Sequence, residues 1–179
     1  RSKIGLVPPI DKTGSMITPK ESLSIDLPDE GSVRQVADGV LWVRMPLPFQ
    51  LNHINLWLLE DGDGWALIDT GINTPETQNL WLKLISNLPH GGRLTRLFCT
   101  HSHPDHMGLA GWFESDFKLD LITTESEWSY GRFFSSGWEG KRAEFSSYFR
   151  KAGCTVRQVQ QIVTHVFESH HMYSGMPSS

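Results

Sequence analysis

Residues 99–111 read CTHSHPDHMGLAG and place three histidines and an aspartate within six positions. His101 and His103 lie two residues apart, so an extended segment directs both imidazoles to the same side. Asp105 and His106 follow where the chain bends into a helix, and they therefore approach from a second direction. This concentration of ligand-type side chains predicts a metal site.

The arrangement can serve two adjacent cations, with His101 and His103 on one ion and Asp105 and His106 on the other. Neutral imidazole and carboxylate suit zinc first, with iron or manganese as alternatives. Two metals can share a hydroxide that acts as a nucleophile near neutral pH, and Asp105 is placed to orient it. The alternative is a histidine-rich surface loop, which this spacing directly after an apolar strand disfavours.

Alternating strand and helix patterns surround the cluster. Strands are expected over residues 33–47, with a turn at Asp38-Gly39, and over 53–60, 65–69, 93–100 and 119–124. Helices are expected over residues 73–89, 106–115, 125–136, 139–152 and 155–168, the last with a capping box of Thr155 and Gln158. This succession predicts a layered α/β domain, in which ligands gather at the carboxyl ends of strands.

The cluster THSHPDHMG (100–108) resembles the His-x-His-x-Asp-His motif of the metallo-β-lactamase-fold hydrolases, a group that includes glyoxalase II and the tRNA 3′-processing nucleases. LIDTGI (67–72) resembles the family's strand that ends in Asp-x-Gly, and residues 52–71 resemble its opening hairpin. The resemblance covers residues 33–125. It implies an α/β fold of the αββα sandwich type, with two sheets flanked by helices and metals at one edge.

Residue by residue, the resemblance implies that His101 and His103 bind the first metal and that Asp105 and His106 bind the second. Asp69 matches an acid behind the ligands that supports the site, although on its own it could equally be a turn residue at a strand end. Histidine at 103 separates this chain from the flavodiiron oxidoreductases, which carry glutamate there. Histidine at 106 favours two zinc ions over one.

The family pattern continues with a further histidine, a bridging aspartate and a last histidine on later strands. None of His53, His90, His165, His170 and His171 has that strand-end context, although His53 and the stretch SHHMYSG (169–175) could approach the site. We therefore expect residues 1–31 to be an extended arm and 32–179 to be the N-terminal portion of a longer metallo-β-lactamase-like domain. Alone, these 179 residues are expected to bind metal weakly and to be inactive.

The expected function is metal-dependent hydrolysis of an ester, thioester or related acyl substrate, a small molecule. RNA phosphodiester hydrolysis is an alternative that the net charge of −4 makes less favourable, and a non-catalytic scaffold with an incomplete site is another. Two cysteines and the lack of an apolar run of ~18 residues favour a cytoplasmic protein away from membranes. The aromatic stretch 125–150 is either a wall over an apolar substrate or ordinary helix packing.

Overall fold

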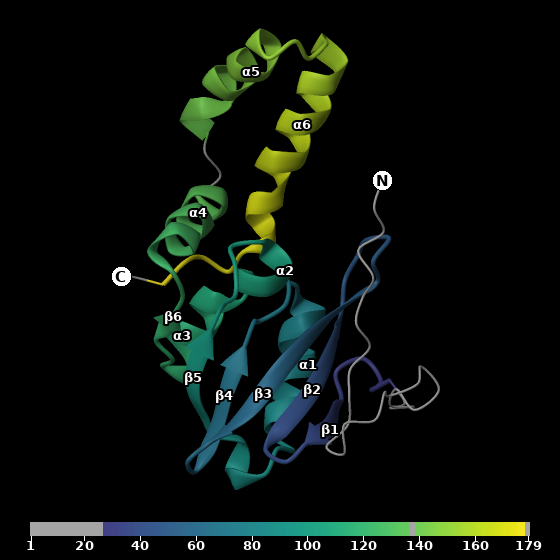
Figure 1. Cartoon of the computed structure of the whole chain (residues 1–179), viewed down its shortest axis with the longest axis vertical. Coiled ribbons are helices and arrows are strands. Elements are labelled where there is room, and N and C mark those ends of the chain that lie inside the picture. The colour runs from purple at the N-terminus through teal and green to yellow at the C-terminus, as the bar shows by residue number, and fades with distance from the viewer. Residues whose placement is uncertain (1–26, 137–138, 178–179) are drawn as a thin grey trace, which may run out of the picture.

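The computed structural model describes residues 27–136 and 139–177, and its strands form one six-stranded sheet (Figure 1). The strands are β1 (Val33–Ala37), β2 (Val40–Pro46), β3 (His53–Asp61), β4 (Gly64–Ile68), β5 (Leu94–Phe98) and β6 (Leu121–Ile122), and they lie side by side in chain order. Every strand expected from the sequence is present, although the last has only two residues.

The sheet changes direction at β4. Strands β1 to β4 pair antiparallel, through tight turns between β1 and β2 and between β3 and β4 and through residues 47–52 between β2 and β3. Strand β5 runs parallel to β4, and β6 runs parallel to β5. Parallel neighbours end at the same edge of a sheet, so the segments that follow β4 and β5 leave from adjacent points. Asp69 follows β4, and the histidine cluster follows β5. The topology alone therefore brings these two parts of the sequence together.

The described residues form six α-helices and three short 3-10 turns. The helices are α1 (Pro75–Ile85), α2 (Pro104–Met107), α3 (Ala110–Phe117), α4 (Glu125–Ser135), α5 (Arg142–Lys151) and α6 (Val156–Glu168), with short 3-10 turns η1 (His90–Gly92), η2 (Glu139–Lys141) and η3 (Ser169–Met172). The side chain of Thr74 caps α1, and the capping box of Thr155 and Gln158 opens α6 as the sequence predicts.

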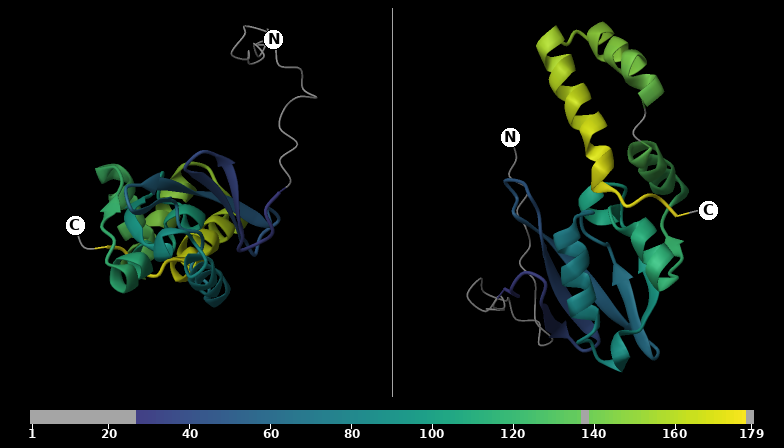
Figure 2. Two further views of the ribbon diagram at one scale, coloured as in Figure 1. Left: turned by 90° about the horizontal axis from the view of Figure 1, so that it is seen from below. Right: turned by 180° about the vertical axis from the view of Figure 1, so that it is seen from behind.

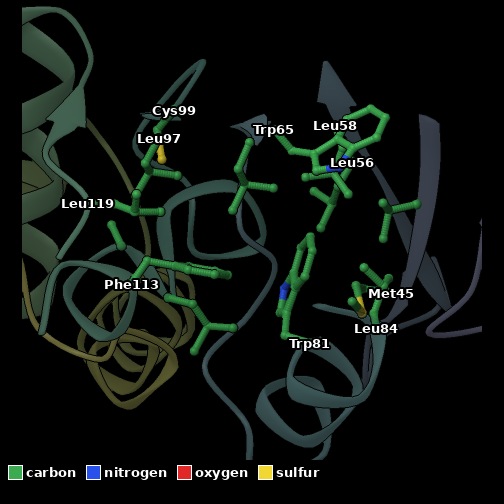
Figure 3. Packing of buried hydrophobic residues seen from close by; sticks show 14 of the residues in the cluster. Met45, Leu56, Leu58, Trp65, Trp81, Leu84, Leu97, Cys99, Phe113 and Leu119 are labelled. Atoms are coloured by element: carbon green, nitrogen blue, oxygen red, sulfur yellow. The ribbon is translucent and has the colours of Figure 1, made fainter. Parts of the chain in front are cut away.

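The main core lies between one face of the sheet and the helices α1 and α3 (Figures 2 and 3). Trp81 of α1 and Phe113 of α3 meet edge to face with ring centroids 5.4 Å apart, and both side chains are fully buried. They pack with inward-facing strand residues such as Leu56 and Leu97. Burial stabilises each such side chain by about 1.5–3 kcal/mol, so this layer fixes the sheet against the helices.

The prediction of a single helix over residues 106–115 is wrong. The chain instead forms α2 and α3, separated at Gly108 and Leu109. The carbonyl group of Gly108 accepts a hydrogen bond from the Ser174 amide at 2.6 Å, and the Leu109 amide donates to the Thr70 hydroxyl at 3.0 Å. A Cβ at residue 108 would also meet backbone oxygens of two other segments at under 3 Å. Tertiary contacts therefore override the local helical pattern here.

Helices α5 and α6 form a hairpin that projects beyond the sheet (Figure 1). It has a small core of its own, in which Val159, Val163 and Phe167 of α6 are buried against Phe145 and Phe149 of α5. The rings of Phe145 and Phe167 lie 5.9 Å apart. The base of α6 continues through η3 back to α2 and α4, so the hairpin returns the chain to the histidine cluster.

The opposite face of the sheet carries a stacked pair, Trp42 and Trp57, with ring centroids 6.1 Å apart. The described residues form one sheet with helices on one face, so the second sheet implied by the family resemblance is not among them. Most of the arm expected at residues 1–31 lies outside the described residues. None of the helices that the structure describes is long and apolar enough to cross a membrane.

Candidate metal centre

The turn after β4 holds Asp69 in an unusual backbone conformation. Its φ is +61°, in the left-handed region where aspartate is one of the few tolerated side chains. The Asp69 amide donates to the carbonyl group of Phe98 on β5, and the next amide, of Thr70, donates to the carbonyl group of His106. The turn is thereby tied to both ends of the histidine cluster, and the Asp69 side chain is directed into it.

The Asp69 carboxylate is buried and makes hydrogen bonds to residues of the histidine cluster and its neighbour Thr100. It accepts hydrogen bonds from the Thr100 amide at 2.7 Å, from the Thr100 hydroxyl at 2.8 Å and from His106 Nδ1–H at 2.8 Å. Because a carboxylate can only accept, His106 must carry its proton on Nδ1 and present the lone pair of Nε2 outward. Asp69 therefore fixes the tautomer of one predicted ligand directly.

The same carboxylate fixes the tautomer of His101 through Thr100. The Thr100 hydroxyl has one proton, which it donates to Asp69, so its oxygen is left to accept from His101 Nδ1–H at 3.0 Å. The lone pair of His101 then lies on Nε2, which faces Nδ1 of His103 at 3.2 Å. A histidine whose second nitrogen is held by a carboxylate network is the usual arrangement behind a metal ligand.

The imidazole rings crowd together above this network. The ring centroids of His101 and His106 lie 3.9 Å apart, and those of His101 and His103 lie 4.7 Å apart. Burial and the neighbouring His106 and His103 lower the pKa of His101, which favours the neutral ring that a metal requires. Burial also acts to lower the pKa of His106, but the hydrogen bond and charge of Asp69, together with Asp105, outweigh it and raise that pKa.

Two residues from the helical part of the chain hold the peptide between His101 and His103. The Ser102 amide donates to Glu127 Oε2 of α4 at 2.7 Å, and the Ser102 carbonyl group accepts from the Tyr173 hydroxyl at 2.6 Å. The hydrogen bond from Ser102 lowers the pKa of Glu127, and burial raises the pKa of Tyr173. The backbone that carries two predicted ligands is therefore fixed from both sides.

The donor atoms fit a metal in type and in pairwise spacing. Two ligands of a tetrahedral zinc ion, at bond lengths of about 2.0–2.2 Å, lie roughly 3.3–3.6 Å apart. His106 Nε2 and Asp105 Oδ2 are 3.5 Å apart, and His101 Nε2 and His103 Nδ1 are 3.2 Å apart. Within the described residues, no group of three or more His, Cys, Asp or Glu side chains is arranged to hold an ion. Among the described residues, the predicted ligands therefore offer two pairs of donor atoms at this spacing.

A largely apolar cavity of about 390 Å³ opens beside the donor pairs. His103 and Asp105 contribute polar groups to its lining, and Pro104 lies between them. The remaining walls come from the β2–β3 connection and from the helical segment that includes Phe134 and Tyr173. The cavity volume lies within the range of about 300–1,000 Å³ that is usual for small-molecule sites. A substrate in this cavity would touch Asp105 directly.

The structure brings together every residue that the sequence singled out for the cluster, namely His101, His103, Asp105, His106 and Asp69. His53 does not join them, because its Nδ1 contacts Arg44 and Asn52 instead. His90 lies in η1 and contacts Glu60. The stretch 169–175 does reach the site, but through Tyr173 and not through its histidines.

Sequence reasoning missed Glu127 and Tyr173. Their hydrogen bonds to Ser102 span 25 and 71 residues of chain, and neither residue stands in a pattern that predicts such a contact. Thr100 is adjacent to the cluster in sequence. Its hydrogen bonds to both Asp69 and His101 could not be predicted without the sheet topology that brings Asp69 next to it.

Comparisons with known proteins place the chain in a family. Two curated relatives come from Bacillus subtilis (strain 168). "Probable metallo-hydrolase YqjP" is 30% identical over 83 residues, which is 46% of this chain and 26% of the relative. "Probable metallo-hydrolase YybB" is 25% identical over 100 residues, which is 55% of this chain and 43% of the relative. The chain thus spans less than half the length of these relatives.

A solved structure, that of a beta-lactamase domain protein from Burkholderia ambifaria, superposes with a TM-score of 0.69 and 29% identity. The match covers 87% of this chain and 45% of that one. Residues 50–170 match the family model described as the metallo-beta-lactamase superfamily. Since this match covers well over half of the sequence and includes the whole donor cluster, the chain belongs to the metallo-beta-lactamase superfamily.

Proposed function

We propose that the protein is a metal-dependent hydrolase of an ester, thioester or related acyl substrate. His101 and His103 would hold one ion, and Asp105 and His106 a second, with zinc as the metal. The observation that carries the proposal is the spacing of the two donor pairs, 3.2 Å and 3.5 Å, at the mouth of an apolar cavity. The superfamily usually binds metal ions, and the curated relatives are named as metallo-hydrolases.

Bound metal would supply a nucleophile from water near neutral pH and would polarise the substrate's carbonyl oxygen. The chain's own residues would orient the metal ligands and accept a proton from the attacking water. Asp69 and Thr100 keep the Nε2 lone pairs of His101 and His106 directed into the centre. The carboxylate of Asp105 lines the cavity, so it can orient the attacking water and take up its proton next to the substrate.

The lining of the cavity supports an acyl substrate over RNA. None of the described residues that form it is lysine or arginine, and most are apolar. Phosphodiester recognition depends on cationic side chains that neutralise backbone phosphates. The non-catalytic alternative is disfavoured because all four predicted ligands are present and because Asp69 holds His106 directly and His101 through Thr100.

The test uses a chain that includes the later ligand-bearing strands of the family, because these 179 residues alone are expected to be inactive. It measures zinc content together with turnover of acetyl and longer-chain thioesters, aryl esters, lactones, β-lactams and a single-stranded RNA. We expect zinc-dependent turnover of thioesters or esters. Asp105→Asn should leave the fold intact and reduce this turnover, whereas His90→Asn, a histidine change far from the site, should not. Cleavage of RNA alone would favour the nuclease alternative, and tight zinc binding without any turnover would favour the scaffold.

A further inference from the structure

The cavity beside the donor pairs is built from three separate segments. The connection between β2 and β3 contributes Leu47, Phe49 and Leu51, and the ligand loop contributes His103 and Asp105. The third wall comes from α4, α6 and the segment after α6, and consists of Phe134, His165, Val166, Ser169, Met172 and Tyr173. No single element would create this space, so its shape depends on how the helical segment docks against the sheet.

The polar groups of the cavity are unevenly distributed. His103 and Asp105 lie at the end formed by the predicted ligands, and the helical wall adds the polar groups of His165, Ser169 and Tyr173. The β2–β3 connection presents only apolar side chains. Phe49 and Leu51 are 44% and 60% exposed, so apolar side chains stand open to water at the border of an already apolar space. Such a patch next to a polar reaction centre is characteristic of a site that an apolar ligand covers.

From this layout we propose that the cavity binds the apolar acyl chain of the substrate, with the carbonyl carbon at the His103 and Asp105 end. The assignment rests on the proposed function and names its substrate class. An apolar cavity of about 150 Å³ accommodates a six-carbon ring, so by proportion 390 Å³, shared with the reacting group, suits a chain of roughly eight to twelve carbons. A polar or charged acyl group would find no matching partner along the β2–β3 wall.

The first experiment measures binding without metal or turnover. Neutral methyl ketones of increasing chain length, from butanone to dodecanone, are titrated into the metal-free protein and followed by calorimetry. Ketones replace fatty acids because the Asp105 carboxylate would repel an anion at this position. The association constant should rise about fourfold for each added methylene until the cavity is filled, as burial of a methylene contributes about 0.8 kcal/mol. Equal or undetectable binding of short and long ketones would overturn the proposal.

The second experiment removes the apolar border. Phe49→Ser combined with Leu51→Ser should lower the association constant for decanone, and kcat/KM for a decanoyl thioester, by about tenfold or more. Butanone binding and turnover of an acetyl thioester should decrease much less, because a short chain does not reach this border. Both residues are exposed, so the fold should tolerate the change. Ile122→Ser is the matched control, since Ile122 is 43% exposed on β6 and does not line the cavity. An equal effect on short and long chains would contradict the assignment.

A substrate series separates this inference from the proposed function. In one arm the acyl chain is varied with a constant thiol or alcohol, and in the other arm the alcohol chain is varied with a constant acetyl group. Dependence on the acyl chain supports the proposal, whereas dependence on the alcohol chain alone overturns it. Turnover that ignores chain length in both arms refutes the acyl cavity but leaves the hydrolase intact. Chain-dependent ketone binding, together with no hydrolysis by a chain that includes the later ligand-bearing strands of the family, refutes the hydrolase and leaves the cavity assignment standing.

Discussion

Replacing Asp69 with asparagine isolates the hydrogen-bond network beneath the donor pairs. Asparagine has the same shape as aspartate and tolerates the left-handed backbone at this position, where φ is +61°. The substitution therefore changes the chemistry of the side chain and leaves the turn unstrained. Three donors converge on the carboxylate, namely the amide and hydroxyl of Thr100 and the Nδ1–H of His106, at 2.7–2.8 Å.

A side-chain amide cannot satisfy this set of donors. If the oxygen of the introduced asparagine accepts from the Thr100 amide, its NH₂ group faces the Thr100 hydroxyl and Nδ1 of His106. The imidazole of His106 can then accept only by moving its proton to Nε2, which removes the lone pair directed at the metal. Hydrogen bonds to a charged group contribute about 1.5–3 kcal/mol each, so the loss of one or two should lower the unfolding free energy by about 2–4 kcal/mol.

The expected effect on zinc is a decrease in affinity of about 10- to 100-fold, the usual consequence of losing the carboxylate behind a histidine ligand. Urea unfolding of the metal-free protein measures the first quantity, and competitive titration with a zinc chelator measures the second. Asp120→Asn is the matched control, because Asp120 is exposed and lies outside the ligand network. If Asp69→Asn left both the unfolding free energy and the zinc affinity at wild-type values, the network would not organise the ligands and the argument would fail.

Three further predictions concern the same centre. In a chain that includes the later ligand-bearing strands of the family, changing both His101 and His103 to alanine should eliminate bound zinc in elemental analysis. Stoichiometric zinc in that variant would refute the ligand assignment. Tyr173→Phe removes a buried hydroxyl and should lower both the zinc affinity and the unfolding free energy, the latter by about 1–3 kcal/mol in urea unfolding. An unchanged zinc affinity would show that this hydrogen bond only stabilises the fold. The raised pKa of His106 gives stability that is complete below its unfolded value of about 6.5 and is lost as pH rises through the folded value. The destabilisation of the metal-free protein by Asp69→Asn should consequently be larger near pH 5.5 than near pH 8, and a gap that widens with pH would contradict this.

Much of the fold follows from patterns that act over short distances. Turn residues such as Asp38-Gly39 set the hairpins, and the caps at Thr74 and Thr155 set the starts of two helices. Strands followed by an alternation of helix and strand are enough to place Asp69 and the histidine cluster at one sheet edge. The candidate ligands could be predicted for the same reason, since all four lie within six consecutive positions of the sequence.

Contacts between distant parts of the chain were not predictable in this way. The break between α2 and α3 depends on a hydrogen bond from the Ser174 amide to the Gly108 carbonyl group, 66 residues apart. No local sequence pattern predicts this hydrogen bond. For the aromatic stretch 125–150 the sequence left open a wall over an apolar substrate and ordinary helix packing. Phe134 lines the cavity, while Phe145 and Phe149 pack against α6.

The helical segment after β6 has a larger role than its sequence suggests. Glu127 accepts from the amide of Ser102 and Tyr173 donates to its carbonyl group, so the directions of His101 and His103 depend on where this segment docks. The same segment supplies Tyr173 to the cavity wall. Any displacement of the segment would therefore alter the spacing of a donor pair and the volume of the cavity at once. The position of this one segment therefore affects both the directions of His101 and His103 and the shape of the cavity in which the substrate's acyl chain would lie.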